Sequence, residues 1–542
     1  MGIRTARLSR PLVVLAVLCL YAAARGASAQ EASAAASEPV HGRIVLVLPF
    51  DNRSGHPSLE WVREAAAELL TSRLSSAGFA PLSREDRLYA LDHLGLPEAF
   101  QPSRASALKL AQTLDAESIV VGSFKTEGNE IVAEARVVDV PHLRMSKAVT
   151  VRGPLPTMID VFDRLGWRVT RVMYPEFSGS EATFVAAGKG MRVDAFEQYI
   201  RGITEPDQAE RLTHLNMAVK LSPGFGPAWM ALGREEYSEQ QYGEAAAAFA
   251  RVERRSPDAL EAGFYRGLSQ LFSGNYAKAE ESFAEVARIL PLAEVLNNEG
   301  VAMSRQNHDG SVLFRRAVAA DPNSADYHFN LAVSLKRRGE NAGAMTEMTE
   351  CLKLRPGDSE AQSVMKAWKS PAAAATTNAE EEAKVDPLER IVRTFDAMAF
   401  RQAALVVDQL ETARLAALSP EERGMKLAAQ AKTYLNRGLL LEAERMYQSA
   451  VAADGNLATA HAGLAEVKER AGDKAAARNE AEAALKIAPT AEAHEVLGRL
   501  DLGEGRLDEA DAEAKEALRL DPGSRSAQDL SRQIAVKRTA KQ

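Results

Sequence analysis

Small and large apolar residues follow a pattern that recurs every 34 residues along the carboxyl-terminal two-thirds of the chain. In the clearest unit, two small residues, an aromatic residue and a proline follow one another as Gly233, Ala245, Phe249 and Pro257. The spacing begins again at Gly267, Ala332, Ala431, Ala465 and Gly498, with weaker copies at Gly300, 192–223 and 388–420. This period predicts antiparallel helix pairs that stack on one another, because one pair alone cannot bury its apolar stripe.

The spacing and its residues resemble the tetratricopeptide repeat family over about 192–369 and 388–538. The resemblance implies two all-α superhelical arrays whose concave faces bind extended or helical segments of other proteins, and it brings no catalytic chemistry. Residues 370–387, between the arrays, lack apolar periodicity and contain a run of three Glu, which predicts a linker. Residues 359–369 and 525–538 have the amphipathic pattern of capping helices.

The first helix of each unit is expected to line the concave face. In the first array its inward positions are mainly apolar: Met230, Tyr237, Phe264, Leu268, Leu271, Phe272, Phe329 and Val333. In the second array the equivalent positions are charged: Glu466, Glu469, Glu492, Glu495 and Arg499. This contrast predicts a hydrophobic peptide groove in the first array and a solvated, weakly cation-attracting groove in the second. The alternative is that apolar side chains form inter-helix core or are covered by the amino-terminal domain.

Two asparagines are also predicted to bind a peptide. Asn298 precedes Gly300 by two residues and Asn330 precedes Ala332 by two, so both occupy the same place on adjacent first helices. In relatives of the tetratricopeptide family, an Asn at this place resembles a ladder rung whose amide hydrogen-bonds the backbone of a bound peptide. The other units have Ala, Tyr, Gly or Val there, so the predicted ladder has two rungs. The alternative is an ordinary exposed helical residue.

The region 43–178 lacks the period and alternates strand and helix patterns. The apolar run 44–50, followed by the polar residues 51–55, predicts a central strand that ends in a loop. The following amphipathic helix is predicted to end at Gly78. Later patterns predict a helix over 105–114, strands over 118–125, 130–140 and 147–151, and a helix over 155–174. We therefore predict an α/β domain, in which the helix count of 80–103 stays open.

Three segments of this region, 47–55, 114–123 and 130–139, resemble the TolB-like amino-terminal domain that often precedes tetratricopeptide arrays in bacteria. The resemblance implies a protein-docking module without catalytic residues. The loop between Asp51 and His56 follows a central strand, where open α/β sheets hold ligands. The same residues are also typical of an ordinary turn, and both interpretations stay open.

The start of the chain has the pattern of an export signal. Basic residues, an apolar run and a small-residue cleavage site follow one another as Arg4, Arg7 and Arg10, residues 11–24, and Ala27-Ser28-Ala29. We expect a signal peptide, 1–29, cleaved after Ala29, then a flexible segment, 30–42, and a periplasmic or secreted mature protein. The apolar run of 14 residues is short for a membrane span. The alternatives are an uncleaved anchor and a lipoprotein modified at Cys19.

The composition is that of a globular protein, with 46% hydrophobic and 26% charged residues. Removal of residues 1–29, which contain four arginines and no acid, changes the formal net charge from −8 to −12. This charge disfavours nucleic acid and anionic membranes as partners. Cys19 leaves with the signal, so Cys351 remains alone and no internal disulfide forms. Its place on a repeat helix predicts a small buried residue.

The sequence contains no pattern of catalytic or metal-binding residues. The His residues show no His-Glu-x-x-His spacing, and Gly188-Lys189-Gly190 lacks the leading Gly and the Ser or Thr of a phosphate-binding loop. We therefore predict a non-enzymatic, exported scaffold, without metal, cofactor or membrane span after signal cleavage, whose arrays bind protein or peptide partners. The alternative is an envelope sensor whose α/β domain binds a small ligand while the arrays dock. The sequence determines neither the partner nor the oligomeric state.

Overall fold

The computed structural model describes residues 44–97, 103–252, 258–369, 386–395 and 413–541. The predicted signal peptide and the segment 30–42 lie outside the described residues. The chain forms two compact units. We term the described residues within 205–219 and 223–404 the first-array unit, and those within 36–204, 220–222 and 405–542 the sheet unit. None of the helices in the described part of the chain has the length and apolar character needed to span a bilayer.

Within the described residues, seven strands of the sheet unit form one mixed sheet. They are β1 (Ile44–Val47), β2 (Asp51–Asn52), β3 (Ala80–Pro81), β4 (Ser118–Glu127), β5 (Glu130–Asp139), β6 (Arg144–Met145) and β7 (Val149–Pro154). The order is β3-β1-β4-β5-β6, with β2 paired to β4 and β7 paired to β5. β1 runs parallel to β3 and β4, whereas β4 and β5 form an antiparallel hairpin. The four predicted strands correspond to β1, β4, β5 and β7.

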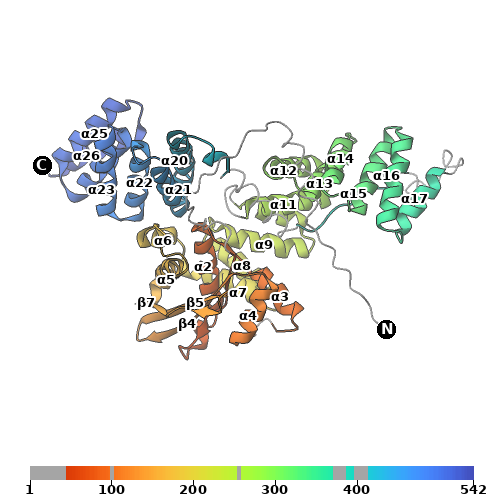
Figure 1. Cartoon of the computed structure of the whole chain (residues 1–542), viewed down its shortest axis with the longest axis horizontal. Helices are drawn as coiled ribbons and strands as arrows, with labels where there is room; N and C mark the ends of the chain where they lie inside the picture. Colours follow the sequence, from red (N-terminus) through yellow and green to blue (C-terminus); the bar gives the residue numbers. More distant parts are fainter. Residues whose placement is uncertain (1–43, 98–102, 253–257, 370–385, 396–412, 542) are drawn as a thin grey trace, which may run out of the picture. The chain divides into compact units, whose positions relative to one another are not determined.

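Helices cover both faces of this sheet (Figure 1). The helices of the domain are η1 (Pro57–Leu59), α2 (Val62–Ser76), α3 (Arg84–His93), α4 (Arg104–Thr113), η2 (Leu155–Thr157) and α5 (Met158–Met173). Leu46 of β1 is buried in one cluster with Leu91 of α3 and Leu110 of α4. Phe50 contacts Phe162 of α5, with ring centroids 5.9 Å apart. Because both faces are buried, the first strand is a continuous apolar run.

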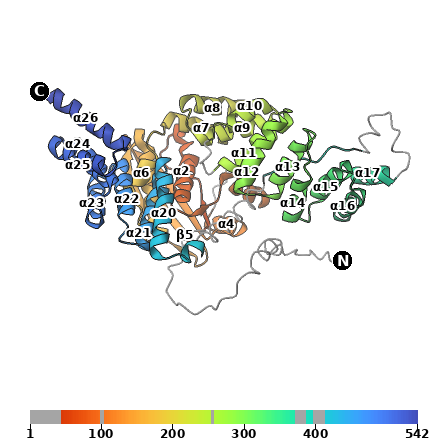
Figure 2. The ribbon, with the colours of Figure 1, turned by 90° about the horizontal axis from the view of Figure 1, so that it is seen from above.

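Paired helices make up both arrays. The first-array unit contains α8 (Gln208–Leu221), α9 (Gly226–Ser238), α10 (Tyr242–Phe249), α11 (Ala259–Phe272), α12 (Tyr276–Ile289), α13 (Ala293–Ser304), α14 (Ser311–Ala320), α15 (Ala325–Arg337), α16 (Asn341–Leu354) and α17 (Ser359–Lys369). The second array contains α20 (Pro420–Asn436), α21 (Leu440–Ala453), α22 (Ala458–Ala471), α23 (Lys474–Ile487), α24 (Ala491–Glu504), α25 (Leu507–Leu520) and α26 (Arg525–Lys541). From α9 to α17 and from α20 to α26, consecutive helices pack side by side (Figures 1 and 2). The predicted fold class, an α/β domain followed by all-α arrays, is confirmed.

The recurring small residue allows the two helices of a unit to approach closely. A Cβ atom at Gly233 would lie 2.8 Å from the ring of Phe249, and one at Gly267 would lie 2.8 Å from the ring of Phe283. Both rings are buried. The aromatic ring of the second helix therefore occupies the space that a side chain on the first helix would need.

Two helices that lie, in the sequence, after the α/β domain and before the repeats belong to the sheet unit. α6 (Glu181–Ala187) packs against α21 and α22, where the Ser180 N–H donates to the Glu444 carboxylate at 3.2 Å. α7 (Val193–Thr204) packs against α2 of the α/β domain. The periodicity of the sequence, in contrast, placed the start of the first array at residue 192 and so included α7 in it. The pattern of an amphipathic helix shows that one face is buried, but it does not show which apolar surface covers that face.

Candidate functional site

Residues 386–395 of the chain lie along first helices of the first array. Their backbone contacts α15, then α13, then α11, which is opposite to the order of these helices in the sequence. We term the surface formed by these three helices the first groove, and residues 386–395 the groove segment. The groove segment contains neither helix nor strand.

Asn330 and Asn298 each bind one residue of the groove segment through both its N–H and its carbonyl. Asn330 donates to the Arg390 carbonyl at 2.7 Å and accepts from the Arg390 N–H at 2.7 Å. Asn298 makes the same pair of bonds with Val392, at 2.7 and 3.0 Å. Both asparagines are fully buried. Since the bound residues are two apart, which is the period of an extended chain, equivalent asparagines on adjacent helices bind one edge of a strand-like segment.

Two arginines of the first groove bind other backbone carbonyls of the groove segment, at odd-numbered positions, whereas the asparagines bind even-numbered positions. Arg337 donates to the Pro387 carbonyl at 3.0 Å, and Arg305 donates to the Glu389 carbonyl at 3.1 Å. Backbone contacts do not depend on the side chain of the bound residue. They therefore fix the position and direction of the segment more than its sequence.

The side chain of Arg390 is surrounded by carboxylates. Its guanidinium donates to Asp358 at 2.6 Å, to Asp326 at 2.9 Å and to Glu360 at 2.7 Å. The same group lies 3.8 Å from the ring centroid of Phe329. The hydrogen bond from Arg390 lowers the pKa of Asp358, and although burial opposes the charged form of Arg390, the carboxylates raise its pKa. The subsite therefore suits a planar, permanently positive group.

Glu389 occupies a neighbouring subsite of opposite charge. Its side chain is 1% exposed, and Arg305 lies 3.8 Å from its carboxylate. The carboxylate also accepts hydrogen bonds from Ser304 and Arg337. A carboxylate buried to this extent needs such partners, because nothing else compensates for its lost hydration.

The carboxyl-terminal end of the groove segment enters an aromatic cluster. Phe395 packs against Phe264 with ring centroids 5.4 Å apart, and the Arg393 guanidinium lies 4.9 Å from the ring centroid of Phe272. The backbone of Phe395 hydrogen-bonds the hydroxyl of Tyr265. On its own first helix, Tyr265 holds the place of the two asparagines. The ladder therefore has a third, aromatic rung, whereas the sequence predicted two.

The structure divides the ten predicted binding residues into three groups. Those in direct contact with the groove segment are Phe264, Phe272, Asn298, Phe329 and Asn330. Leu268 and Leu271 are buried in the cluster on which Ile391 and Phe395 pack. Met230 and Val333 are buried in clusters between helices, and Tyr237 packs against Tyr242 and Tyr265. Met230 and Val333 therefore match the alternative in which apolar residues of the first helices form core between helices, rather than the wall of an open groove.

Sequence reasoning missed the polar residues that complete the site: Asn297, Arg305, Asp326, Arg337, Asp358 and Glu360. Asn297 donates to the Arg390 carbonyl at 3.1 Å and accepts from Asn330 at 2.7 Å. One available signal was an acidic residue at the second position of successive first helices, Asp326 in α15 and Glu360 in α17.

The location of the groove segment differs from the prediction. The sequence placed 370–387 in a linker and 388–420 in a weak helical pair of the second array, but residues 386–395 are non-helical and belong to the first-array unit. Residues 396–412 lie outside the described residues. The contacts that decide this are remote in sequence, since Asn298 and Val392 are 94 positions apart. The spacing of residues within one repeat cannot predict a contact between positions so far apart in the sequence.

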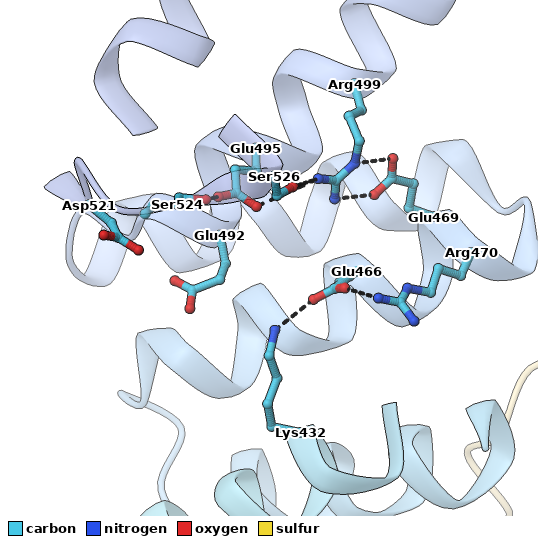
Figure 3. A pocket seen from close by; sticks show the side chains of 11 residues that line it. Lys432, Glu466, Glu469, Arg470, Glu492, Glu495, Arg499, Asp521, Ser524 and Ser526 are labelled. Carbon is cyan, nitrogen blue, oxygen red and sulfur yellow. Dashed lines mark hydrogen bonds and ion pairs between the residues drawn. The ribbon is translucent and has the colours of Figure 1, made fainter. Parts of the chain in front are cut away.

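The second array has a charged hollow on its first helices (Figure 3). This second groove has a volume of about 500 Å³, and its lining includes all five charged residues predicted for this face. Arg499 donates to Glu469 at 2.8 and 2.7 Å, and Lys432 donates to Glu466 at 2.9 Å. Burial alone would raise the pKa of Glu466, but the cations beside it lower the pKa. Most charges of this groove are therefore paired with one another.

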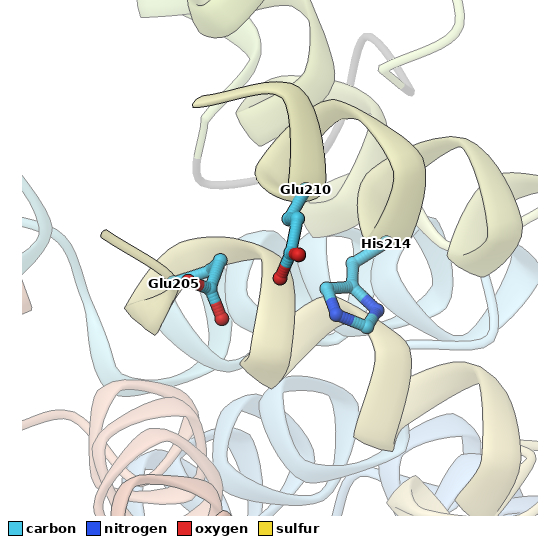
Figure 4. A group of neighbouring side chains, drawn as sticks. All are labelled: Glu205, Glu210 and His214. Atoms are coloured by element: carbon cyan, nitrogen blue, oxygen red, sulfur yellow. The ribbon is translucent and has the colours of Figure 1, made fainter. Parts of the chain in front are cut away.

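A group of possible metal ligands lies at the start of α8 (Figure 4). Glu205, Glu210 and His214 bring ligand atoms within 4.8 Å of one another. Glu210 is exposed and the other two are partly exposed. Exposed acidic groups of this kind are common without a bound ion, so we assign no metal to this group.

Cys351 is a free, buried thiol in the core of the first array. Burial raises the pKa of Cys351 to about 11. The thiol is therefore protonated at neutral pH, which does not suit a nucleophile.

The loop between Asp51 and His56 is closed by its own polar groups. Asn52 donates to the His56 carbonyl at 3.2 Å and to the Glu60 carboxylate at 3.1 Å. The Ser54 N–H donates to the Asn52 side chain at 3.0 Å. These are the hydrogen bonds of an ordinary turn.

The sequence pattern of the tetratricopeptide repeat family matches residues 230–294 and 302–359 in the first array and 463–525 in the second. Both arrays contain tetratricopeptide repeats. No curated protein matches the chain.

Solved structures resemble parts of the chain. MamA from Desulfovibrio magneticus RS-1 is 21% identical over 31% of this chain and 99% of that chain, with a TM-score of 0.29. YrrB, described as a TPR protein with an unusual peptide-binding site, is 14% identical over 36% of this chain and 96% of that chain, with a TM-score of 0.29. The C-terminal domain of LpoB from Salmonella enterica is 19% identical over 22% of this chain and 87% of that chain, with a TM-score of 0.20.

Proposed function

We propose that this protein is a scaffold that holds extended segments of other polypeptides in the first groove. The observation that carries the proposal is the double hydrogen bonding of Asn330 and Asn298 to the backbone of Arg390 and Val392. Two buried amides that bind both polar groups of every second residue can hold an extended chain of any origin. The repeats support the proposal, because stacked helix pairs present long continuous surfaces.

The proposal includes an exported location and a non-catalytic role. The export signal 1–29, with cleavage after Ala29, supports a periplasmic or secreted mature protein. The segments 47–55, 114–123 and 130–139 support a TolB-like docking module. Partners are proteins or peptides, in keeping with the negative charge of the chain. The loop between Asp51 and His56 offers no support for the alternative of a small-ligand sensor, because its polar groups bond to one another.

A peptide titration tests the proposal. In the full-length chain, residues 386–395 are replaced by an equal length of Gly and Ser, and a fluorescent peptide with the sequence of 384–397 is added. We expect saturable one-to-one binding. Adding Asn298→Ala and Asn330→Ala should weaken binding by at least about tenfold, because four hydrogen bonds to the peptide backbone are lost.

The matched control is Asn216→Ala in the same chain. Asn216 is exposed on α8 and donates to the Leu212 carbonyl of its own helix at 2.8 Å. Its replacement should leave peptide binding unchanged. If the chain with the replaced segment keeps its helical circular dichroism but binds no peptide, the proposed function is wrong.

A further inference from the structure

We propose that the groove segment is a tethered competitor that keeps the first groove occupied until a partner with the same side-chain pattern displaces it. The pattern is an acidic residue, Arg, two aliphatic residues, two variable residues and Phe, as in residues 389–395. The partner is therefore an extended polypeptide segment that carries this pattern. This inference rests on the proposed function and adds the partner's chemistry and its regulation.

Two adjacent subsites of opposite charge set the pattern. Glu389 is held by Ser304 and Arg337, whereas Arg390 is held by Asp326, Asp358 and Glu360 and lies over Phe329. A segment with these two charges exchanged would place a carboxylate among carboxylates and a cation beside arginines. Such like-charge contacts discriminate strongly between ligands.

The first groove selects only weakly among side chains at the other positions of the groove segment. Leu388 is 65% exposed and Thr394 is exposed, and the exposed Arg393 lies over the ring of Phe272. Phe395, in contrast, packs against Phe264 at the end of the site. The selective contacts therefore fall on positions 389, 390 and 395, and on the aliphatic side chains of Ile391 and Val392, which pack on buried clusters. The backbone is held at 390 and 392.

The helices of the groove have cores of their own, without the groove segment. Phe329 and Val333 of α15 are buried with Met348 and Cys351 of α16. The groove segment contributes neither helix nor strand, and it is held by hydrogen bonds, ion pairs and the packing of Ile391 and Phe395 against these helices. A ligand of this kind can leave and return while the array stays folded.

The covalent tether makes the segment a strong competitor. Residues 370–385 connect it to α17 of the same unit. A short tether gives an effective concentration of about 1 mM, so a free segment of equal intrinsic affinity at micromolar concentration occupies little of the groove. Weakening the tethered copy, without changing the groove, should therefore open the groove to an external peptide.

The experiment uses the full-length chain and the fluorescent peptide of 384–397. Arg390→Ala removes the side chain that contacts three carboxylates, while every residue of the first groove is kept. We expect this variant to bind the peptide at least about tenfold more tightly than the unchanged chain. Leu388→Ala is the matched control, since it shortens a side chain of the same segment that is 65% exposed, and it should bind like the unchanged chain. A peptide that carries Arg390→Glu should bind neither to the unchanged chain nor to the Arg390→Ala chain.

Each other outcome overturns a distinct statement. If the unchanged chain binds the peptide as tightly as the Arg390→Ala chain, there is no competition, although the proposed function stands. If only the chain with the Gly and Ser replacement gains affinity, Arg390 is not the anchor and the pattern is wrong. If the unchanged chain sediments as a dimer that Arg390→Ala dissociates, the segment is exchanged between copies and the intramolecular competitor is wrong. If no variant binds peptide, the proposed function itself fails.

Discussion

The first and second grooves are built from the same repeat but offer opposite chemistry to a ligand. Asn330 and Phe329 of α15 correspond, by the repeat spacing, to Val496 and Glu495 of α24. In the first groove, the asparagine amides bind the backbone of another segment. In the second groove, charged side chains bind one another, as Glu469 and Arg499 do. A groove whose polar groups are already paired has little left for a peptide backbone, so a few side chains decide which array binds.

An acidic residue at one shared position sharpens this difference. Asp326 in α15 and Glu492 in α24 both hold the second position of a first helix. Asp326 binds Arg390 at 2.9 Å, whereas Glu492 faces the open hollow of the second groove. The same position is thus part of a filled charge subsite in one array and part of a solvated lining in the other.

The largest expected effect comes from removing the two asparagine rungs of the first groove in the otherwise unchanged chain. Asn298→Ala together with Asn330→Ala should release the groove segment, because each asparagine is worth about 1–3 kcal/mol to the docked state. The Arg390 and Val392 amides donate to these two side chains. Their hydrogen exchange, measured by mass spectrometry, should become as fast as in an unprotected peptide.

The Asn216→Ala chain again serves as the control and should keep its protection at both amides. Unchanged protection in the double variant would show that the asparagines do not hold the segment. The contrast between the two grooves would then lose its physical basis.

A smaller effect is expected on acidification. The hydrogen bond from Arg390 lowers the pKa of Asp358, and although burial would raise the pKa of Asp326, Arg355 and Arg390 lower it. Carboxyls with lowered pKa values stabilise the docked state fully above the ordinary Asp pKa of about 3.9 and lose that contribution as the pH falls through the lowered values.

Peptide binding to the chain with the Gly and Ser replacement should therefore be constant above about pH 5 and weaken below about pH 4. The measurement is the fluorescence titration at a series of pH values. A loss of binding between neutral pH and about pH 6 would contradict the assignment, because it would require a group other than these carboxyls.

The smallest effect is expected in the second groove. Arg499→Ala removes the partner of Glu469, but the Arg499 side chain is 29% exposed, so the cost should be about 1 kcal/mol or less. Thermal unfolding followed by circular dichroism measures it. Hydrogen exchange of the groove segment should not change, and a change there would show that the two grooves are coupled.

The sequence by itself determined the repeats, the α/β domain and the place of the ladder residues. The 34-residue period arises because every unit must satisfy the same packing between neighbouring helices, such as that of Gly233 with Phe249. The period also placed Asn298 and Asn330 on equivalent faces of adjacent helices. Stacking then brings their amides into one row, and the structure shows both binding one segment.

Only the tertiary structure decided what lies in the first groove and where α7 packs. The groove segment meets Asn298 from 94 positions away, and α7 meets α2 across the chain. Neither contact repeats, so no periodic signal encodes it. The apolar stripe of a helix such as α7 is compatible with several surfaces. The groove segment is placed by charges such as Asp326, Asp358 and Arg390, which meet only when the chain is folded.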